Sequence, residues 1–161
     1  MAEIEAKLQK MGLILPKELI TPAGLTLPFK PVVLRGNRAY VSGHAPQEAG
    51  GAITGPFGKV GQELTIEQGY QAAKLVGLSM LGSLKRALGD LDRVTAWLRV
   101  LGMVNVAPGF NKTTLVVNGF SELILELYGP ERGAHTRSAV GMAALPLDIP
   151  VEIEAEVEIA V

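Results

Sequence analysis

Two features of the sequence place chemically useful side chains in strand-like apolar segments. Arg137 opens an apolar run that reaches Ala143, and a guanidinium can bind a carboxylate through two parallel hydrogen bonds. The last segment of the chain alternates apolar residues with four glutamates: Glu152, Glu154, Glu156 and Glu158. A glutamate on a sheet face within reach of an arginine could orient or deprotonate a water molecule. The two features together point to binding or hydrolysis of a small carboxylate.

Each feature also has a purely structural explanation. An arginine at the start of a strand is often a surface residue, and the residues around Arg137 by themselves favour that explanation. Glutamates on one face of the last strand are also expected on the solvent side of an antiparallel sheet, or on an edge strand that must not pair with another chain. Both interpretations stay open at this level.

Other chemistries lack the residues that they need. The sequence has no Cys, which excludes disulfides, thiolate metal sites and thiol nucleophiles. His44 and His135 are the only histidines, so a metal site would need both to converge with a carboxylate, and we expect no metal. The motifs of phosphate loops, dinucleotide sites and zinc proteases are absent. A formal net charge of -1 without a basic stripe argues against a nucleic-acid partner.

The composition predicts that the chain associates with copies of itself. Hydrophobic residues make up 48% of the 161 residues, and charged residues only 19%. A single domain of this size buries roughly 70% of the surface of its unfolded chain, which leaves little room to hide so many apolar side chains. No run of about 18 apolar residues could span a membrane, and the charges at Glu3, Glu5 and Lys7 do not fit a signal peptide. We therefore expect a cytoplasmic oligomer without a membrane partner.

Hydrophobic periodicity and turn residues predict the elements that position these side chains. Helices with apolar stripes are expected at 65–88 and 119–128, the first with a capping box at Thr65 and Gln68, and a short helix is expected at 2–12. Strands are expected at 32–34, 39–41, 94–104, 137–145 and 150–160, with a tight turn at Gly36 and Asn37 and with loops at 43–64 and 106–118. This order predicts an α+β fold with two helices on one face of the sheet.

The connection between the last two strands decides whether Arg137 and Glu152 can meet within one chain. The turn at 145–150 makes these strands antiparallel, and pairing across it would place Glu152 opposite residue 143 rather than opposite Arg137. Local pairing therefore does not bring the arginine to the glutamate. If the two side chains share a site, they meet across another strand or another subunit.

Several segments of the sequence resemble the Rid family, the reactive-intermediate deaminases also named RidA/YjgF and once labelled L-PSP endoribonucleases. The run from Ala39 to Pro46 is similar to the Ser-Gly-x-x-Pro motif of that family, and 65–88 is similar to its first helix. The C-terminal signature is matched by Arg137-Ser138-Ala139-Val140, by Leu145-Pro146 and by Val151 to Ala155. The resemblance covers 27–160 and is that of a longer, less characterised branch. We therefore divide the chain into an N-terminal extension, 1–26, and a RidA/YjgF-like domain, 27–161.

The resemblance implies a chorismate mutase-like fold, a homotrimer and active sites in clefts between subunits. It implies hydrolysis of imines and enamines such as 2-aminoacrylate to a 2-keto acid and ammonia, without a metal or an organic cofactor. Arg137 would hold the substrate carboxylate, and Glu152 would position or activate the attacking water. Substrate-binding residues would be Phe29, Ser42, Gly43, Asn118 and Ala139.

Two departures from the family pattern bear on this expectation. Ala139 stands where well-known members have a cysteine, and Phe29, after Pro28, stands where they have a tyrosine. A non-catalytic, regulatory binder of small carboxylates on the same trimer is therefore the alternative. An endoribonuclease is the weakest candidate, because the chain is nearly neutral and the sequence gives no paired histidine acid and base.

Overall fold

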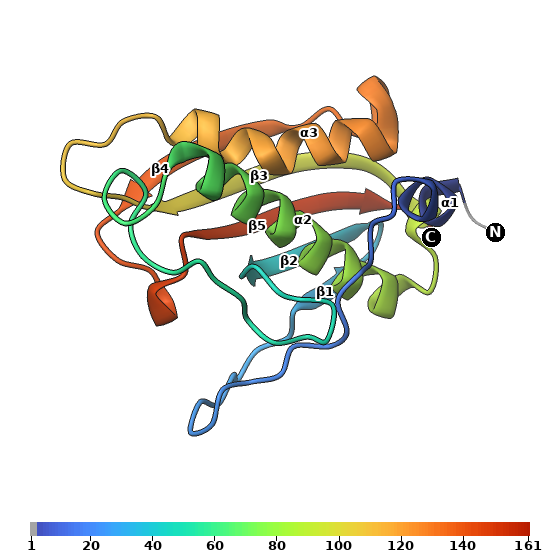
Figure 1. The fold of residues 1–161 in the computed structure, drawn as a ribbon. Helices are drawn as coiled ribbons and strands as arrows, with labels where there is room; N and C mark the ends of the chain where they lie inside the picture. The colour runs from blue at the N-terminus through green and yellow to red at the C-terminus, as the bar shows by residue number, and fades with distance from the viewer. Residues whose placement is uncertain (1–2) are drawn as a thin grey trace.

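The computed structural model describes residues 3–161 as one mixed sheet with two long helices on the same face (Figure 1). The sheet order is β1-β2-β5-β3-β4, and only the β3–β4 pair is parallel. The strands are β1 (Val32–Arg35), β2 (Arg38–His44), β3 (Val94–Asn105), β4 (Thr136–Met142) and β5 (Val151–Ile159). The helices are α1 (Glu3–Lys10), α2 (Ile66–Leu88) and α3 (Thr113–Arg132), with 3-10 turns η1 (Leu91–Arg93) and η2 (Pro146–Asp148). The predicted α+β architecture is confirmed.

The ends of α2 and the first hairpin form as their local sequence predicts. The Thr65 side chain accepts a hydrogen bond from the Gln68 backbone N–H, and the Gln68 side chain accepts one from Thr65 in return. Gly89 ends the helix with a left-handed φ of 80°. Gly36 and Asn37 join β1 to β2 as a two-residue turn. The predicted start of the short helix at residue 2 lies outside the described residues, and its described part, α1, ends at Lys10.

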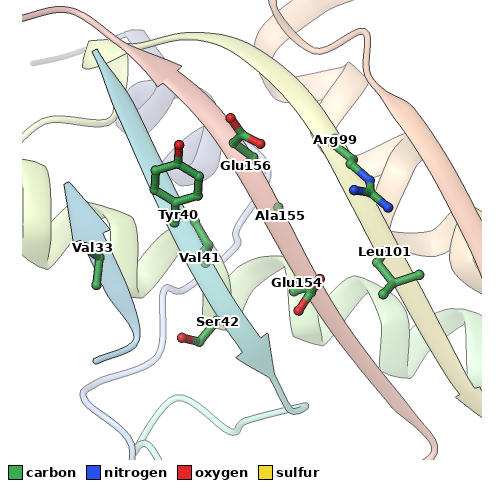
Figure 2. Close-up of a pocket in the computed structure, with 9 residues that line it drawn as sticks. All are labelled: Val33, Tyr40, Val41, Ser42, Arg99, Leu101, Glu154, Ala155 and Glu156. Carbon is green, nitrogen blue, oxygen red and sulfur yellow. The ribbon is translucent and has the colours of Figure 1, made fainter. Parts of the chain in front are cut away.

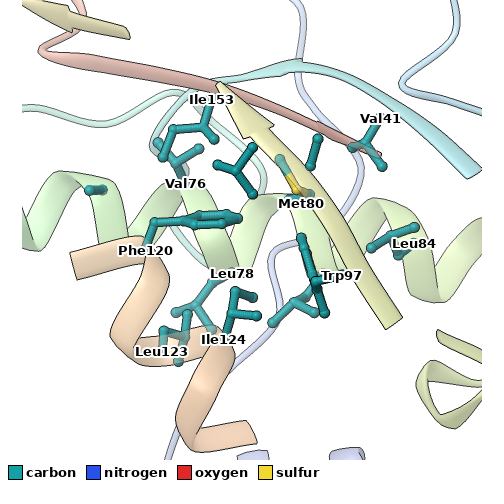
Figure 3. Packing of buried hydrophobic residues seen from close by; sticks show 14 of the residues in the cluster. Val41, Val76, Leu78, Met80, Leu84, Trp97, Phe120, Leu123, Ile124 and Ile153 are labelled. Atoms are coloured by element: carbon teal, nitrogen blue, oxygen red, sulfur yellow. The ribbon is translucent and has the colours of Figure 1, made fainter. Parts of the chain in front are cut away.

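The core lies between the sheet and the two long helices. The apolar face of β5 is buried under α2, where Ile153 is fully buried, while α3 covers β3 and β4. Trp97 of β3 packs edge-on against Phe120 of α3 (Figure 3), with ring centroids 5.7 Å apart. It also packs edge-on against Tyr128 of the same helix, with ring centroids 5.8 Å apart. Because successive side chains of a strand point to opposite faces of the sheet, every second residue of each strand points away from this core.

The second long helix begins earlier than predicted. Residues 106–118 were expected to form a loop, but α3 already begins at Thr113. β-Branched residues and the absence of a side-chain cap at Lys112 weaken the local helix signal. Packing overrides it, because Val116 and Val117 are fully buried. Asn118 therefore lies inside α3 rather than before it.

The last two strands run antiparallel, as predicted, but they are not neighbours. β5 pairs with β2 and β3, and β4 pairs with the far edge of β3, so the predicted pairing of residue 152 with residue 143 is wrong. The connection through η2 steps across the end of β3. The length of the turn could not reveal this. β4 pairs with one edge of β3 and β5 pairs with the other, so β3 lies between the two strands that the turn connects.

The other side of the sheet carries neither α2 nor α3, and we name it the helix-free face. Figure 2 looks onto it: Tyr40, Glu154, Glu156, Arg99 and Leu101 project from three neighbouring strands around a shallow hollow of about 250 Å³. Tyr40 is 46% exposed although its ring is large and mostly apolar. None of the helices in residues 3–161 is both long and apolar enough to cross a membrane. The helix-free face is thus a broad surface of mixed polarity.

The contact between α2 and α3 predicts a large effect of adding one methyl group. A Cβ at Gly119 would lie 2.0 Å from the backbone oxygen of Tyr70, so the helices must separate. We expect Gly119→Ala to lower the free energy of unfolding by about 2–3 kcal/mol, since overpacking outweighs the ~1 kcal/mol gain in helix propensity. Urea unfolding measures the change.

Glu126→Ala is the control, because Glu126 is exposed on the same helix and its substitution should change the unfolding free energy by no more than about 0.5 kcal/mol. Equal stability of Gly119→Ala and the wild type would contradict this helix contact.

Candidate functional site

The seven residues predicted to form a site lie in two separate groups. Phe29, Ser42, Gly43 and Glu152 line one cavity of about 560 Å³, which we name the Glu152 cavity. Arg137, Asn118 and Ala139 lie together between α3 and β4. The site residues stay a prediction, and within one chain the fold gathers them into two groups that do not meet.

A bulge in β2 shapes the first group. Val41 pairs with Ala155 and His44 with Ile153, so Ser42 and Gly43 together stand opposite the single residue Glu154. The Ser42 hydroxyl donates to the Lys30 backbone oxygen at 2.7 Å, and the Ser42 N–H donates to that of Pro31 at 2.9 Å. The bulge therefore ties the segment before β1 to the rim of the Glu152 cavity.

Gly43 leaves the space that the Glu152 carboxylate occupies. A Cβ at Gly43 would lie 2.9 Å from the carboxylate carbon. Glu152 is half-buried, and this burial raises its pKa above the usual range, with a smaller contribution from repulsion by Glu154. A carboxyl with a raised pKa is a better proton acceptor near neutral pH than an ordinary surface glutamate.

Loops close the Glu152 cavity at the end of the sheet. In η2, Leu147 and Asp148 have left-handed φ values of 57° and 55°, which cost energy in residues other than glycine. The Asp148 carbonyl accepts a 2.8 Å hydrogen bond from the Gly58 N–H, which helps to hold this backbone. Leu147 lines the cavity, and Phe29, 56% exposed, lines it from the opposite loop.

The second group is organised around the guanidinium of Arg137. Its Nη1 donates to Asn118 Oδ1 at 3.0 Å and to Ser121 Oγ at 2.9 Å, and its Nη2 lies 3.4 Å from the Thr114 carbonyl oxygen. Partial burial lowers the pKa of Arg137, but a guanidinium keeps its charge at any physiological pH. Its side chain is thus held in one orientation by α3.

His135 extends this network to a residue that sequence reasoning did not select. Its Nδ1 lies 2.7 Å from the Gly133 carbonyl, and its Nε2 lies 2.9 Å from Ser121 Oγ. In the neutral imidazole, Nδ1–H donates to Gly133 and Nε2 accepts the Ser121 hydroxyl proton, which leaves Ser121 Oγ free to accept from Arg137. Burial, and then Arg137, lower the pKa of His135 and so favour that neutral form. Asn118 and Ser121 are three residues apart, which places them side by side on one face of a helix. This spacing was the sequence signal that could have identified Ser121 as a second partner of Arg137.

The other histidine builds the same arrangement beside the Glu152 cavity. His44 Nδ1 lies 2.6 Å from the Ser42 carbonyl, and its Nε2 lies 2.9 Å from Ser83 Oγ. Arg86 Nη2 donates to the same hydroxyl at 3.1 Å, and Arg86 lines the cavity. Burial lowers the pKa of His44, and Arg86 adds to that shift. Each group of site residues therefore contains an arginine held by a serine and a histidine.

Arg137 and Glu152 face opposite sides of the sheet. Arg137 is level with Val100 and, through it, with Ala155, all of which face the helices. Glu152 pairs with Met103 and faces away from the helices. Two strand spacings and three residues separate them, so their Cα atoms are about 14 Å apart. One chain therefore does not bring these two predicted catalytic side chains together.

A cluster of acidic residues away from both groups has a structural role. Within residues 3–161, oxygens of Glu5, Asp90 and Asp92 lie within 4.8 Å of one another, as ligands of a cation might. Asp92 accepts hydrogen bonds from the first N–H groups of α1, and Glu5 accepts from Lys85 and from the Leu91 N–H. These bonds explain the cluster as the attachment of α1.

The network around Arg137 predicts how His135 titrates. Removing the guanidinium charge in Arg137→Gln should raise the pKa of His135, because Arg137 lowers it in the wild type. The pKa of His44, which faces Arg86 instead, should stay unchanged. An NMR titration of the two imidazoles measures both values in one experiment, and an unchanged His135 pKa would contradict the network.

Comparison with known proteins identifies the family. The family model described as "YjgF/chorismate_mutase-like, putative endoribonuclease" matches residues 5–154. Protein TCP17 of Trypanosoma cruzi is 38% identical over 157 residues, which cover 97% of this chain and 94% of that protein.

Solved structures agree with this assignment. Atu1372 of Agrobacterium tumefaciens, a protein of unknown function, is 38% identical with a TM-score of 0.87, over 99% of this chain and 94% of that one. A Shewanella oneidensis protein whose description also names an endoribonuclease is 27% identical with a TM-score of 0.86, over 97% and 99% of the two chains. Escherichia coli TdcF with bound serine shares the fold at 20% identity and a TM-score of 0.59, over 89% and 99%. The chain therefore belongs to the YjgF/chorismate mutase-like family.

Proposed function

We propose that this protein hydrolyses 2-imino acids and their enamine forms to 2-keto acids and ammonia, in clefts between the chains of a homotrimer. The observation that carries this proposal is the split of one chemically complete set of residues into two half-sites. Arg137 and Asn118 supply an anion-binding group, and Glu152 supplies a half-buried carboxyl with a raised pKa. Neither half-site is sufficient for the reaction by itself.

Association of the helix-free face of one chain with the β4 edge of the next would bring the half-sites of different chains together, because Arg137 lies on that edge strand. That face carries Tyr40, Leu101 and Val140 between charged side chains, and a sequence that is 48% hydrophobic favours burying such a surface. A head-to-tail interface closes into a ring, in which each chain gives one half-site to each neighbour. A trimer of this kind has three equivalent clefts.

The proposed reaction needs a substrate held in one orientation and a side chain that accepts a proton and then returns it. Arg137 binds the substrate carboxylate through paired hydrogen bonds, which fixes the imine carbon against Glu152. Glu152 takes a proton from water as the water oxygen bonds to the carbon of the protonated imine, which gives a neutral tetrahedral amino alcohol. The protonated Glu152 then gives its proton to the amino group. As the C–N bond breaks and ammonia leaves, the hydroxyl proton passes to Glu152 and the C=O bond of the 2-keto acid forms. Loss of that proton to solvent restores the carboxylate.

Two observations support a small carboxylate as the ligand. TdcF, which shares the fold, holds serine, and serine carries an α-carboxylate. The Glu152 cavity is within the size range of small-molecule sites at about 560 Å³.

A non-catalytic binder of small carboxylates is the second candidate. Ala139 offers only a methyl group, and Phe29 lacks a hydroxyl, so two polar contacts that the family resemblance leads one to expect are missing. Cleavage of RNA is disfavoured, because the helix-free face presents four glutamates and both histidines are occupied in hydrogen bonds at separate half-sites. Cleavage of RNA by protein purified free of contaminating nuclease would instead support an endoribonuclease.

Substitution of the two principal residues separates binding from catalysis. With 2-aminoacrylate generated by a dehydratase, we expect the wild type to accelerate pyruvate release over buffer. Arg137→Ala should raise KM by about 10–100-fold, since a charged hydrogen-bonded contact is lost. Glu152→Gln should lower kcat by about 100-fold or more while a 2-keto acid still binds in calorimetry. Wild-type binding without turnover would favour the regulatory binder instead.

Mixed oligomers test whether the site is shared between chains. Arg137→Ala and Glu152→Gln subunits with different tags are co-expressed and purified through both tags. In every mixed trimer one cleft combines an intact Arg137 with an intact Glu152, so about one third of the wild-type activity should return. Oligomers with two differently tagged Arg137→Ala subunits are the control. Mixed trimers as inactive as that control would exclude the shared cleft.

A further inference from the structure

We propose that residues 17–31 form a specificity wall that selects 2-imino acids with large apolar side chains, such as branched or aromatic ones, over 2-aminoacrylate. This inference rests on the proposed function and deepens it. It concerns the part of the Glu152 cavity that lies beyond the reacting carbon. The segment follows α1, runs past α2 and extends beyond β1 at the edge of the sheet (Figure 1).

The wall of the cavity is predominantly apolar. The 17–31 segment contributes more of these side chains than any other part of the chain. Its apolar side chains include Leu19, Leu25, Leu27 and Phe29 of this segment, with Ile53 and Leu147 opposite them. Its polar side chains include Glu18 and Thr21 of the segment, and Glu152 and Arg86. An imine carbon placed at Glu152 therefore has the apolar part of the Glu152 cavity beside it.

The two ends of the wall are hydrogen-bonded to the rest of the protein, the start through residues 16–20 and the end through Lys30 and Pro31. The Lys17 N–H donates to the Ala49 carbonyl and the Ile20 N–H to the Gly51 carbonyl, both at 3.0 Å. Arg86 Nη1 donates to the Pro16 carbonyl at 3.0 Å, which ties the start of the segment to α2. A chamber that exists before the ligand arrives can favour a matching side chain without an ordering cost.

The size of the chamber exceeds what the smallest substrates need. The side chain of 2-aminoacrylate is a single methylene carbon, whereas the cavity has about 560 Å³. A small substrate would leave most of the apolar wall in contact with water. Each additional carbon removed from water strengthens binding, so a leucine-type side chain, three carbons longer than that of alanine, should raise kcat/KM by about 10–100-fold.

The occupant is the substrate side chain because the same cavity contains the reacting group. Glu152, Ser42 and Gly43 line one continuous space with Leu27 and Leu147. A neighbouring chain inserted into this space would instead cover Glu152 and prevent access of water. The specificity wall and the catalytic carboxylate therefore share one ligand.

Competition between imines of different size tests the inference. Imines are generated in situ by an amino acid oxidase from alanine, leucine and phenylalanine, and release of the keto acids is measured against buffer. We expect the two larger imines to be hydrolysed with at least about 10-fold higher kcat/KM than the alanine-derived one. Leu27→Trp, which fills the chamber, should invert that order, and Leu19→Gln should reduce the preference.

Ile20→Gln is the matched control on the same segment. Ile20 is 60% exposed and is not part of the cavity lining, so its substitution should leave the ratio unchanged. Equal hydrolysis of all three imines, or a Leu27→Trp variant with the wild-type ratio, would overturn the specificity wall and leave the proposed function standing.

A binding measurement separates this failure from failure of the proposed function. Calorimetry with 4-methyl-2-oxopentanoate and pyruvate is carried out on Glu152→Gln, which should bind the larger keto acid at least about 10-fold more tightly. If the wild type hydrolyses no imine, the proposed deaminase activity fails. The same preference in binding then supports the wall as a ligand selector, and equal or absent binding overturns it.

Discussion

The central position of β5 is the constraint on which the other features depend. β5 is hydrogen-bonded on one side to β2 and on the other to β3, and its apolar residues are buried on the face that α2 covers. A shift of one residue would exchange its two faces and place glutamates in the core. The core therefore determines that Glu152 faces away from the helices. The bulge at Ser42 and Gly43 then leaves room for its carboxylate.

The same constraint keeps Arg137 away from Glu152. β4 occupies the outer edge of β3, and Arg137 faces α3, where Asn118 and Ser121 hold its guanidinium. No rotamer can carry either side chain through the sheet. Chemistry that needs both groups requires a second chain, and the helix-free face offers a surface for it. The surplus of apolar residues in the sequence thus gains a specific meaning: in the proposed assembly, part of it lies in the interface that completes the site.

The sequence was sufficient for the elements whose signals are local, and insufficient where distant packing decides. The capping box at Thr65, the hairpin turn and the alternation in β5 were all predicted correctly, because each depends on neighbouring residues. The start of α3 was missed, since burial of Val116 and Val117 outweighs their weak helix propensity. The pairing of the last two strands with each other was wrong, because nothing near Leu145 indicates that β3 lies between β4 and β5. The seven site residues stay a prediction, which the fold divides into two groups. His135 and Ser121 were not selected, since only the fold brings them to Arg137.

In the proposed assembly, the two histidine–serine–arginine units would hold each arginine in place before the chains associate. Holding an arginine side chain in one rotamer costs about 2 kcal/mol of conformational entropy. Hydrogen bonds to Ser121 and Ser83 order the two arginine side chains during folding, so this entropy is lost before a ligand binds. The neutral histidines behind the serines fix the direction of each hydrogen bond. In the proposed cleft, the neighbouring Arg137 opposes the effect of burial on Glu152, because a nearby cation lowers the pKa of a carboxyl. A bound substrate carboxylate would neutralise that cation. The pKa of Glu152 would then rise again, so that the glutamate becomes a stronger base only when a substrate is in place.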